Sequence, residues 1–173
     1  MLVEAVKKKK RCFKITVRDK ADDSFLDFVR QEIIQANADP SRLIFEVTES
    51  AAITNLLNVQ NFIDGLCAIG CGFALDDFGV GFSSFSYIKH LPARYLKIDG
   101  SFIRTLAENK ADQILVRALQ DIARGLGKKT VAEWVETEET REILAGIGVD
   151  YMQGYLFGKP VHWTEALRGE ATC

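Results

Sequence analysis

Two adjacent carboxylates, Asp76 and Asp77, stand between an apolar run and a glycine-broken loop in the segment 72–84. The apolar residues predict a strand, so both carboxylates are expected where that strand ends. Paired carboxylates repel unless a cation lies between them, and oxygen ligands favour Mg²⁺ or Mn²⁺. An Asp-Asp pair before glycine is also typical of a solvated turn whose side chains cap nearby N–H groups. Taken alone, this segment favours the turn over the metal site.

The same pattern recurs at three other places in the chain. The segments 43–49, 95–99 and 130–136 are apolar runs that end in acidic residues or in Lys and Asp, and each precedes a predicted helix. The carboxyl ends of parallel strands carry the chemistry of α/β folds, because neighbouring strands direct their last side chains to one mouth. We therefore predict that one mouth gathers the charged residues of these strand ends, which are Glu46, Asp76, Asp77, Lys97 and Glu133.

Strands and helices are expected to alternate along the chain. The predicted strands lie near 13–17, 42–47, 72–77, 94–98, 129–134 and 149–152, and the predicted helices near 24–37, 54–69, 83–90, 110–125, 137–147 and 163–168. Strict alternation is typical of a parallel sheet. A doubly wound sheet would carry a glycine-rich phosphate turn after its first strand, which is absent, and a closed (β/α) barrel needs eight strands. The residues leave two alternatives: an open sheet, or a barrel without two of its units.

In the predicted helix near 110–125, apolar residues recur with the clearest helical period in the chain. The apolar face of this helix is predicted to consist of Ile114, Leu115, Ala118, Leu119, Ile122 and Leu126.

Composition predicts one soluble domain. The chain has 173 residues, of which 47% are hydrophobic and 27% charged, and a net charge of -2 argues against broad binding to nucleic-acid polymers. The basic run 7–11 is expected to be a solvated helix face, so we predict a basic segment at 1–12 and a domain at 13–173. The four cysteines lack zinc-type spacing. No apolar stretch reaches 18 residues and no signal peptide is evident, which predicts a cytoplasmic chain without membrane contact of its own.

Five ordered blocks carry a resemblance to a known family. They read Phe45–Ser50 (FEVTES), Asp76–Ser84 (DDFGVGFSS), Leu96–Asp99 (LKID), Val131–Thr137 (VAEWVET) and Asp150–Gly158 (DYMQGYLFG). The chain resembles the EAL domain, the bacterial cyclic di-GMP phosphodiesterase family, from Phe13 to Pro160. The resemblance implies a TIM-like (β/α) barrel and hydrolysis of cyclic di-GMP to the linear dinucleotide by a site with two divalent ions, Mg²⁺ or Mn²⁺.

The resemblance also assigns roles to single residues. It implies that Glu46, Asp76 and Asp77 ligate metal, and that Glu133 ligates metal or accepts the proton of the attacking water. Lys97 would hold that water or the charge that develops on phosphate. The remaining residues with implied roles bind substrate or support loops: Glu49 would fix the loop 78–84, Glu136 and Gln153 would complete the pocket wall, and Asp99 belongs to the same set.

Two departures from the family pattern affect the expected activity. The family's Glu-Ala-Leu motif lies on a strand that precedes the other blocks, and this sequence lacks that strand. Glu165–Leu167 has the same letters but follows every other block, so it is not this motif. The position of a metal-binding Asn falls on Lys14, and a lysine is a cation in competition with Mg²⁺. The expected barrel is therefore incomplete, with about six of eight βα units. Compared with the family pattern, it lacks one metal-ligating Glu and one substrate-contacting Arg.

Three hypotheses follow. The first is a phosphodiesterase whose activity in this chain is weak or absent and whose metal binding is weak. The second is a degenerate EAL domain that acts as a cyclic di-GMP receptor or a protein-interaction module; Lys14 favours it, whereas joint retention of the acidic residues and Lys97 opposes it. The third, another TIM-like metal hydrolase, has only the acidic residues in its favour.

Assembly and context complete the expectations. The strands near 13–17 and 149–152 would present unpaired edges, which predicts a homodimer. In a longer protein, an upstream cyclase or sensory domain is expected, and that protein could itself be anchored in a membrane.

Overall fold

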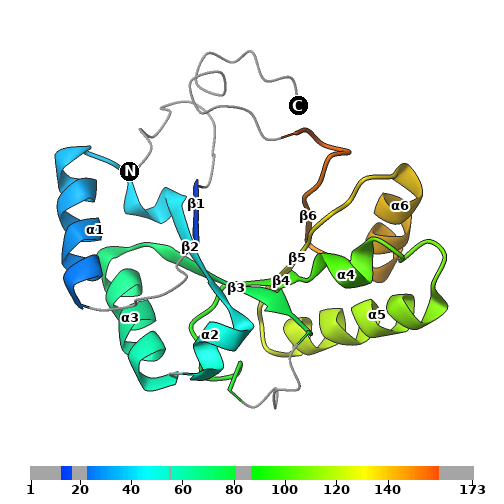
Figure 1. Cartoon of the computed structure of the whole chain (residues 1–173), viewed down its shortest axis with the longest axis horizontal. Coiled ribbons are helices and arrows are strands. Elements are labelled where there is room, and N and C mark those ends of the chain that lie inside the picture. The colour runs from blue at the N-terminus through cyan, green and yellow to red at the C-terminus, as the bar shows by residue number, and fades with distance from the viewer. Residues whose placement is uncertain (1–12, 17–22, 55, 81–86, 160–173) are drawn as a thin grey trace. The chain divides into compact units, whose positions relative to one another are not determined.

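The computed structural model describes residues 13–16, 23–54, 56–80 and 87–159, which form alternating strands and helices (Figure 1). The chain divides into two compact units, each of which is considered by itself. The first comprises residues 1–75 and 83–94, and the second residues 76–82 and 95–173. The basic segment 1–12, the helix expected at 163–168 and most of the helix expected at 83–90 lie outside the described residues. Residues 87–90 form a turn.

The first unit contains two strands, part of a third, and three α-helices. They are β1 (Phe13–Thr16), α1 (Asp23–Gln35), the 3₁₀ helix η1 (Pro40–Arg42), β2 (Leu43–Thr48), α2 (Glu49–Thr54), α3 (Leu56–Ile69) and the start of β3 (Gly72–Phe78). The strand order is β1-β2-β3. β1 and β2 are parallel, with Thr16 level with Glu46.

A cluster of apolar side chains holds the first unit together. Val29 and Ile33 are four residues apart and therefore share one face of α1, and both are buried against α3 and β2. The buried members of this cluster are Val29, Ile33, Leu43, Phe45, Phe62, Leu66 and Cys71. Burial raises the pKa of the Cys71 thiol to about 11. This thiol is therefore a core residue and stays protonated at neutral pH.

The second unit contains the end of β3, then β4 (Tyr95–Ile98), α4 (Gly100–Ile103), α5 (Lys110–Gly125), β5 (Lys129–Ala132), α6 (Glu138–Ile147) and β6 (Tyr151–Met152). The strand order is β3-β4-β5-β6, and β4, β5 and β6 are parallel. Side chains cap the helices where the chain leaves a strand. Asp99 accepts a hydrogen bond from the Ser101 N–H at 2.8 Å, and Thr137 accepts one from the Thr140 N–H at 3.2 Å.

The buried face of α5 differs from the prediction. The helix has its expected bounds, but its buried residues are Val116, Leu119, Gln120 and Ala123, whereas Ile114 and Leu115 are 69% and 47% exposed. The predicted face was therefore wrong at Ile114, Leu115 and Ala118, whereas Leu119 is buried and Ile122 and Leu126 are half-buried. The buried face includes the polar residue Gln120, whose side chain accepts a hydrogen bond from the Thr130 hydroxyl.

The helix predicted at 54–69 corresponds to α3, which begins at Leu56 and ends at Ile69. The separate helix α2, which starts at Glu49 directly after β2, was not predicted. The predicted alternation of parallel strands and helices is otherwise confirmed. Among the described residues, no helix combines the length and the apolar character needed to cross a membrane.

Candidate active site

Lys97 lies at the centre of a buried ion triad in the second unit. Its side chain is 2% exposed, and its Nζ donates a hydrogen bond to Asp76 Oδ1 at 2.7 Å and lies 2.5 Å from Glu133 Oε1. Asp76 is in β3, Lys97 is in β4, and Glu133 directly follows β5. Three consecutive strands therefore bring one cation and two carboxylates together. Removing three charges from water is costly unless they are paired, and here the lysine pairs with both acids.

The residue that follows each of these two carboxylates has a positive φ angle. Asp77 has φ 58° and Trp134 has φ 57°, so both adopt the left-handed backbone conformation that residues other than glycine rarely take. Asp77 follows Asp76, and Trp134 follows Glu133. Non-glycine residues in this conformation cost on the order of 1–3 kcal/mol each and cluster at functional sites. This strain marks the two strand ends that hold Lys97.

Asp77 adds a third carboxylate to this region. Burial raises its pKa above the usual range, and the negative charges of Asp76, Asp99 and Glu133 raise it further, while Lys97 opposes them. Asp99 itself caps α4. The second unit therefore concentrates negative charge around one lysine, and such a site attracts cations.

A pocket of about 210 Å³ adjoins this triad. Its lining residues come from the segments that follow β5 and β6, and they are Glu133, Trp134, Glu136, Gln153, Gly154 and Tyr155. Glu133 belongs to both the triad and the pocket. A ligand in the pocket would therefore contact a carboxylate that already holds Lys97.

Backbone hydrogen bonds fix one wall of the pocket. The Gln153 N–H donates to the Ala132 carbonyl at 2.8 Å, the Val135 N–H donates to the Gln153 carbonyl at 3.1 Å, and the Leu156 N–H donates to the Val135 carbonyl at 3.1 Å. Gly154 lies between these bonds, and a Cβ atom there would overlap the backbone of Val135. Only glycine allows the two segments to approach so closely.

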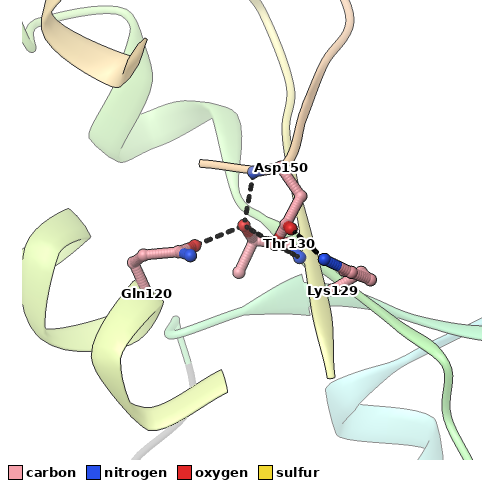
Figure 2. A network of polar contacts seen from close by, with 4 residues as sticks. All are labelled: Gln120, Lys129, Thr130 and Asp150. Carbon is pink, nitrogen blue, oxygen red and sulfur yellow. Dashed lines mark hydrogen bonds and ion pairs between the residues drawn. The ribbon is translucent and has the colours of Figure 1, made fainter. Parts of the chain in front are cut away.

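A second polar cluster anchors the opposite end of β5 (Figure 2). The Thr130 N–H donates to Asp150 Oδ2 at 3.0 Å, Lys129 Nζ donates to Asp150 Oδ1 at 2.6 Å, and the Thr130 hydroxyl contacts Gln120. Burial alone would raise the pKa of Asp150, but the hydrogen bonds from Lys129 and from the Thr130 N–H outweigh it and lower that pKa. This cluster ties α5 and the start of β6 to β5, which carries Glu133 at its other end.

The first unit holds the remaining predicted residues. Glu46 is 6% exposed at the end of β2, and Glu49 is 3% exposed at the start of α2. The Tyr87 hydroxyl donates to Glu49 Oε1 at 2.7 Å. Lys14 of β1 pairs with Ile44 of β2, which lies two residues before Glu46. Two residues correspond to ~6.6 Å along a parallel strand.

The structure thus brings Asp76, Lys97 and Glu133 into contact and lines the pocket with Glu136 and Gln153 beside Glu133. A common mouth that also includes Glu46 stays a prediction, as does the role of Glu49 in fixing the loop 78–84. Sequence reasoning missed Trp134, Tyr155 and Tyr87. An aromatic residue beside a predicted catalytic acid was the only available signal for Trp134.

The described residues offer the right kind of ligand for a metal ion but too few ligands in one place. Within the part of the chain that the structure describes, no group of three or more His, Cys, Asp or Glu side chains is arranged to hold a metal. Asp76 and Glu133 instead converge on the Lys97 ammonium group. These oxygen donors suit a hard cation, and a divalent ion would have to share them with this ammonium group.

Comparisons with known proteins agree on one family. The model of the EAL domain matches residues 7–160. The protein named cyclic di-GMP phosphodiesterase PdeF, from Escherichia coli strain K12, is 46% identical over 132 residues, which are 76% of this chain and 18% of that protein. This chain therefore spans about a fifth of the length of that curated relative.

Solved structures give the same result. The PaMucR phosphodiesterase in complex with c-di-GMP aligns with a TM-score of 0.83 and 38% identity, over 90% of this chain and 64% of that one. A manganese and cyclic di-GMP complex of Klebsiella pneumoniae BlrP1 aligns with a TM-score of 0.79 and 26% identity, over 87% of this chain and 39% of that one. These likenesses confirm the predicted α/β fold of the EAL type, a TIM-like barrel, of which the described residues form six strands.

Proposed function

This chain belongs to the EAL domain family, and from that premise we propose that its function is the hydrolysis of cyclic di-GMP to the linear dinucleotide. The observation that carries the proposal is the pairing of Lys97 with Asp76 and Glu133 at the edge of a pocket. A phosphodiester is an anion, so its hydrolysis needs a cation to offset the developing charge and a base to deprotonate water. Lys97 supplies the first, and Glu133 supplies the second.

The step is a displacement at phosphorus. A water oxygen bonds to phosphorus as one ester P–O bond breaks, Glu133 accepts a proton from the water, and the departing ester oxygen takes a proton from solvent and becomes a hydroxyl. Asp76 and Glu133 favour the charged form of Lys97, which offsets charge on the phosphoryl oxygens. Glu136 and Gln153 are in place to contact the ligand from the pocket wall.

The proposal includes a divalent ion, Mg²⁺ or Mn²⁺, to which Asp76 and Glu133 would each offer a carboxylate oxygen. The manganese complex of BlrP1 supports it. Such an ion, when bound, lowers the pKa of water and draws charge from the phosphoryl oxygens. Lys97 competes for the same oxygens, so we expect weak metal binding. Tight binding of Mg²⁺ or Mn²⁺ at two sites in a calorimetric titration would contradict this expectation.

A receptor function is the second candidate. It is favoured by the same observation that weakens the metal site: among the described residues, two of the carboxylates are engaged by an ammonium group and no group of three could hold a metal. A receptor would bind cyclic di-GMP in the pocket without turnover. The two functions share one ligand and differ in the fate of that ligand.

One experiment separates the two candidates. The purified chain is incubated with cyclic di-GMP and Mn²⁺, and the linear dinucleotide is quantified by chromatography. For the enzyme, Glu133→Gln should lower the rate by about 10²–10⁴-fold, because a general base contributes that much. The matched control is Asp121→Asn, an exposed carboxylate on α5, which should leave the rate unchanged. Binding by calorimetry in Ca²⁺ without turnover in Mn²⁺ would favour the receptor.

Context and assembly complete the proposal. We place the domain in the cytoplasm, as a homodimer, in a protein that also carries a cyclase or sensory domain. The relative named bifunctional diguanylate cyclase/cyclic di-GMP phosphodiesterase MucR, from Pseudomonas aeruginosa, supports the last point, since the chain covers 21% of it. Light scattering tests the dimer, and a monodisperse monomer at micromolar concentration would refute it.

A further inference from the structure

Trp134 combines two features that rarely occur together. It adopts the left-handed conformation with φ 57°, and its side chain is 46% exposed. Bulky residues avoid this conformation, and glycine would adopt it without steric cost. Because nearly half of the side chain is exposed, burial in the core does not by itself account for a tryptophan in this conformation. Another contact or a function must therefore account for a tryptophan at this position.

One contact comes from α4. Gly100 and Arg104 are four residues apart, so they lie on one side of this helical turn, and both meet the Trp134 ring. The Arg104 Cζ atom lies 3.7 Å from the ring centroid, which is a cation–π arrangement. A Cβ atom at Gly100 would overlap the ring. The guanidinium group therefore covers one face of the ring, and Gly100 leaves room for its edge.

The exposed part of the ring borders the pocket. Trp134 lines it together with Tyr155, which is 53% exposed, and with the polar side chains of Glu136 and Gln153. Two aromatic residues and two hydrogen-bonding side chains around a pocket of about 210 Å³ suit a flat, polar ring better than a phosphate group alone. Because Arg104 covers one face of Trp134, such a ring would stack on the opposite face.

We propose that Trp134 is a stacking platform for a nucleobase, held in place by Arg104 and Gly100. This inference rests on the proposed function, because cyclic di-GMP would supply the base. A base stacked on the ring would lie between an aromatic face and solvent, and such stacking tolerates different bases because each has a π-face. Arg104 behind the ring fixes its orientation before the ligand binds, which reduces the entropy lost on binding.

Fluorescence provides a direct test. The chain has two tryptophans, so Trp163→Phe leaves Trp134 as the single fluorophore. In Ca²⁺, cyclic di-GMP should quench this fluorescence, whereas ribose 5-phosphate, which lacks a base, should not. In the wild-type chain, Trp134→Gly should weaken calorimetric binding of cyclic di-GMP about tenfold, because stacking of one base on an aromatic ring contributes that much. Trp134→Phe should restore most of the affinity.

The variants separate stacking from folding. Glycine is favoured at positive φ, so Trp134→Gly should fold with an unchanged or higher melting temperature. Phe28→Ala is the matched control, because Phe28 is 45% exposed on α1 and does not line the pocket. It should leave the affinity unchanged.

The outcomes also separate this inference from the proposed function. Binding of cyclic di-GMP without quenching, or equal affinity of Trp134→Gly, overturns the platform and leaves the function intact. Failure of the wild-type chain to bind or hydrolyse cyclic di-GMP overturns the function. In that case guanosine 5′-monophosphate is the probe, and an absence of quenching at millimolar concentration overturns the platform as well.

Discussion

Lys97 is the single residue on which the site depends most. Its Nζ joins Asp76 and Glu133, and its side chain is 2% exposed. Removing one partner of a buried ion pair leaves uncompensated charge, and here two carboxylates would face each other without a cation. Lys97 and the two acids therefore form a structural unit.

We predict that Lys97→Met destabilises the fold by roughly 3–5 kcal/mol, the usual cost of breaking a buried ion pair. Urea denaturation at pH 7 measures it. The control is Lys129→Met, whose side chain is 54% exposed although it also pairs with an aspartate, and which should cost far less stability than Lys97→Met. Equal losses in the two variants would contradict the special role of Lys97.

The same variant tests the competition between lysine and metal. If the Lys97 ammonium group occupies oxygens that a metal would use, then Lys97→Met should bind Mn²⁺ more tightly than the wild-type chain, as measured by calorimetry. The added Mn²⁺ should also restore part of the lost stability, because it binds only the folded site. Weaker Mn²⁺ binding in this variant would show that lysine supports the metal rather than opposing it.

Among the elements, β5 connects two polar regions. Its first residues contact Asp150 and Gln120, and Glu133 directly follows its last residue. The Asp150 pKa lies below the usual range because of hydrogen bonds from Lys129 and from the Thr130 N–H, which outweigh the effect of burial. A lowered pKa in the folded state means that this carboxylate stabilises the fold above its unfolded pKa of about 3.9.

That contribution should disappear as the solution becomes acidic. We expect the difference in unfolding free energy between wild type and Asp150→Asn to be largest near pH 7 and to shrink as the pH falls through the lowered pKa of Asp150. Urea titrations at pH 7, 5 and 3 measure this difference. A difference that stays constant over this range would show that hydrogen bonding of the neutral amide, rather than charge, is what matters.

The segment after β6 provides a second test of an element. Gly154→Ala should separate this segment from Val135, because the new Cβ atom would overlap the Val135 backbone. Hydrogen exchange at the Val135 and Gln153 amides should accelerate, and the pocket should lose affinity for cyclic di-GMP. Gly146→Ala in α6 is the control. A Cβ atom there meets nothing within 4 Å, and alanine should stabilise the helix by about 0.5–1 kcal/mol.

The sequence predicted the elements better than their faces. The period of the apolar residues located α5 at its observed bounds, because periodicity is a local property of the sequence. The buried face of α5 was not fully predictable, since it includes Gln120, whose side chain accepts a hydrogen bond from Thr130 in another element. Contacts between elements are non-local, and hydrophobicity alone placed Ile114 and Leu115 in a core that excludes them.

The candidate site was predictable to a similar extent. The acids and the lysine at strand ends were recognisable because parallel strands direct their last residues to one edge. The ion triad required the structure, since the sequence does not reveal whether Lys97 contacts a phosphate, a water or the acids themselves. The role of Trp134 also required it, because positive φ and the approach of Gly100 are properties of the folded backbone.

At the scale of the whole molecule, ligand binding should raise the stability of the folded chain. A ligand that binds only the folded chain raises the unfolding free energy by ~2.7 kcal/mol when its concentration is about 100 times its Kd. In Ca²⁺, cyclic di-GMP should therefore raise the melting temperature for as long as the ligand persists. The receptor and the enzyme predict the same shift at the first measurement.

They differ in what happens afterwards. In Mn²⁺, an enzyme converts cyclic di-GMP to the linear dinucleotide, so the melting temperature should return toward that of the free chain as incubation time increases. A receptor should keep the full shift for hours. Glu133→Gln separates the two causes of a falling shift, because loss of the base stops turnover while the pocket remains. A shift that decays equally in wild type and Glu133→Gln would mean that ligand loss does not depend on this site, and it would remove the support for Glu133 as the base.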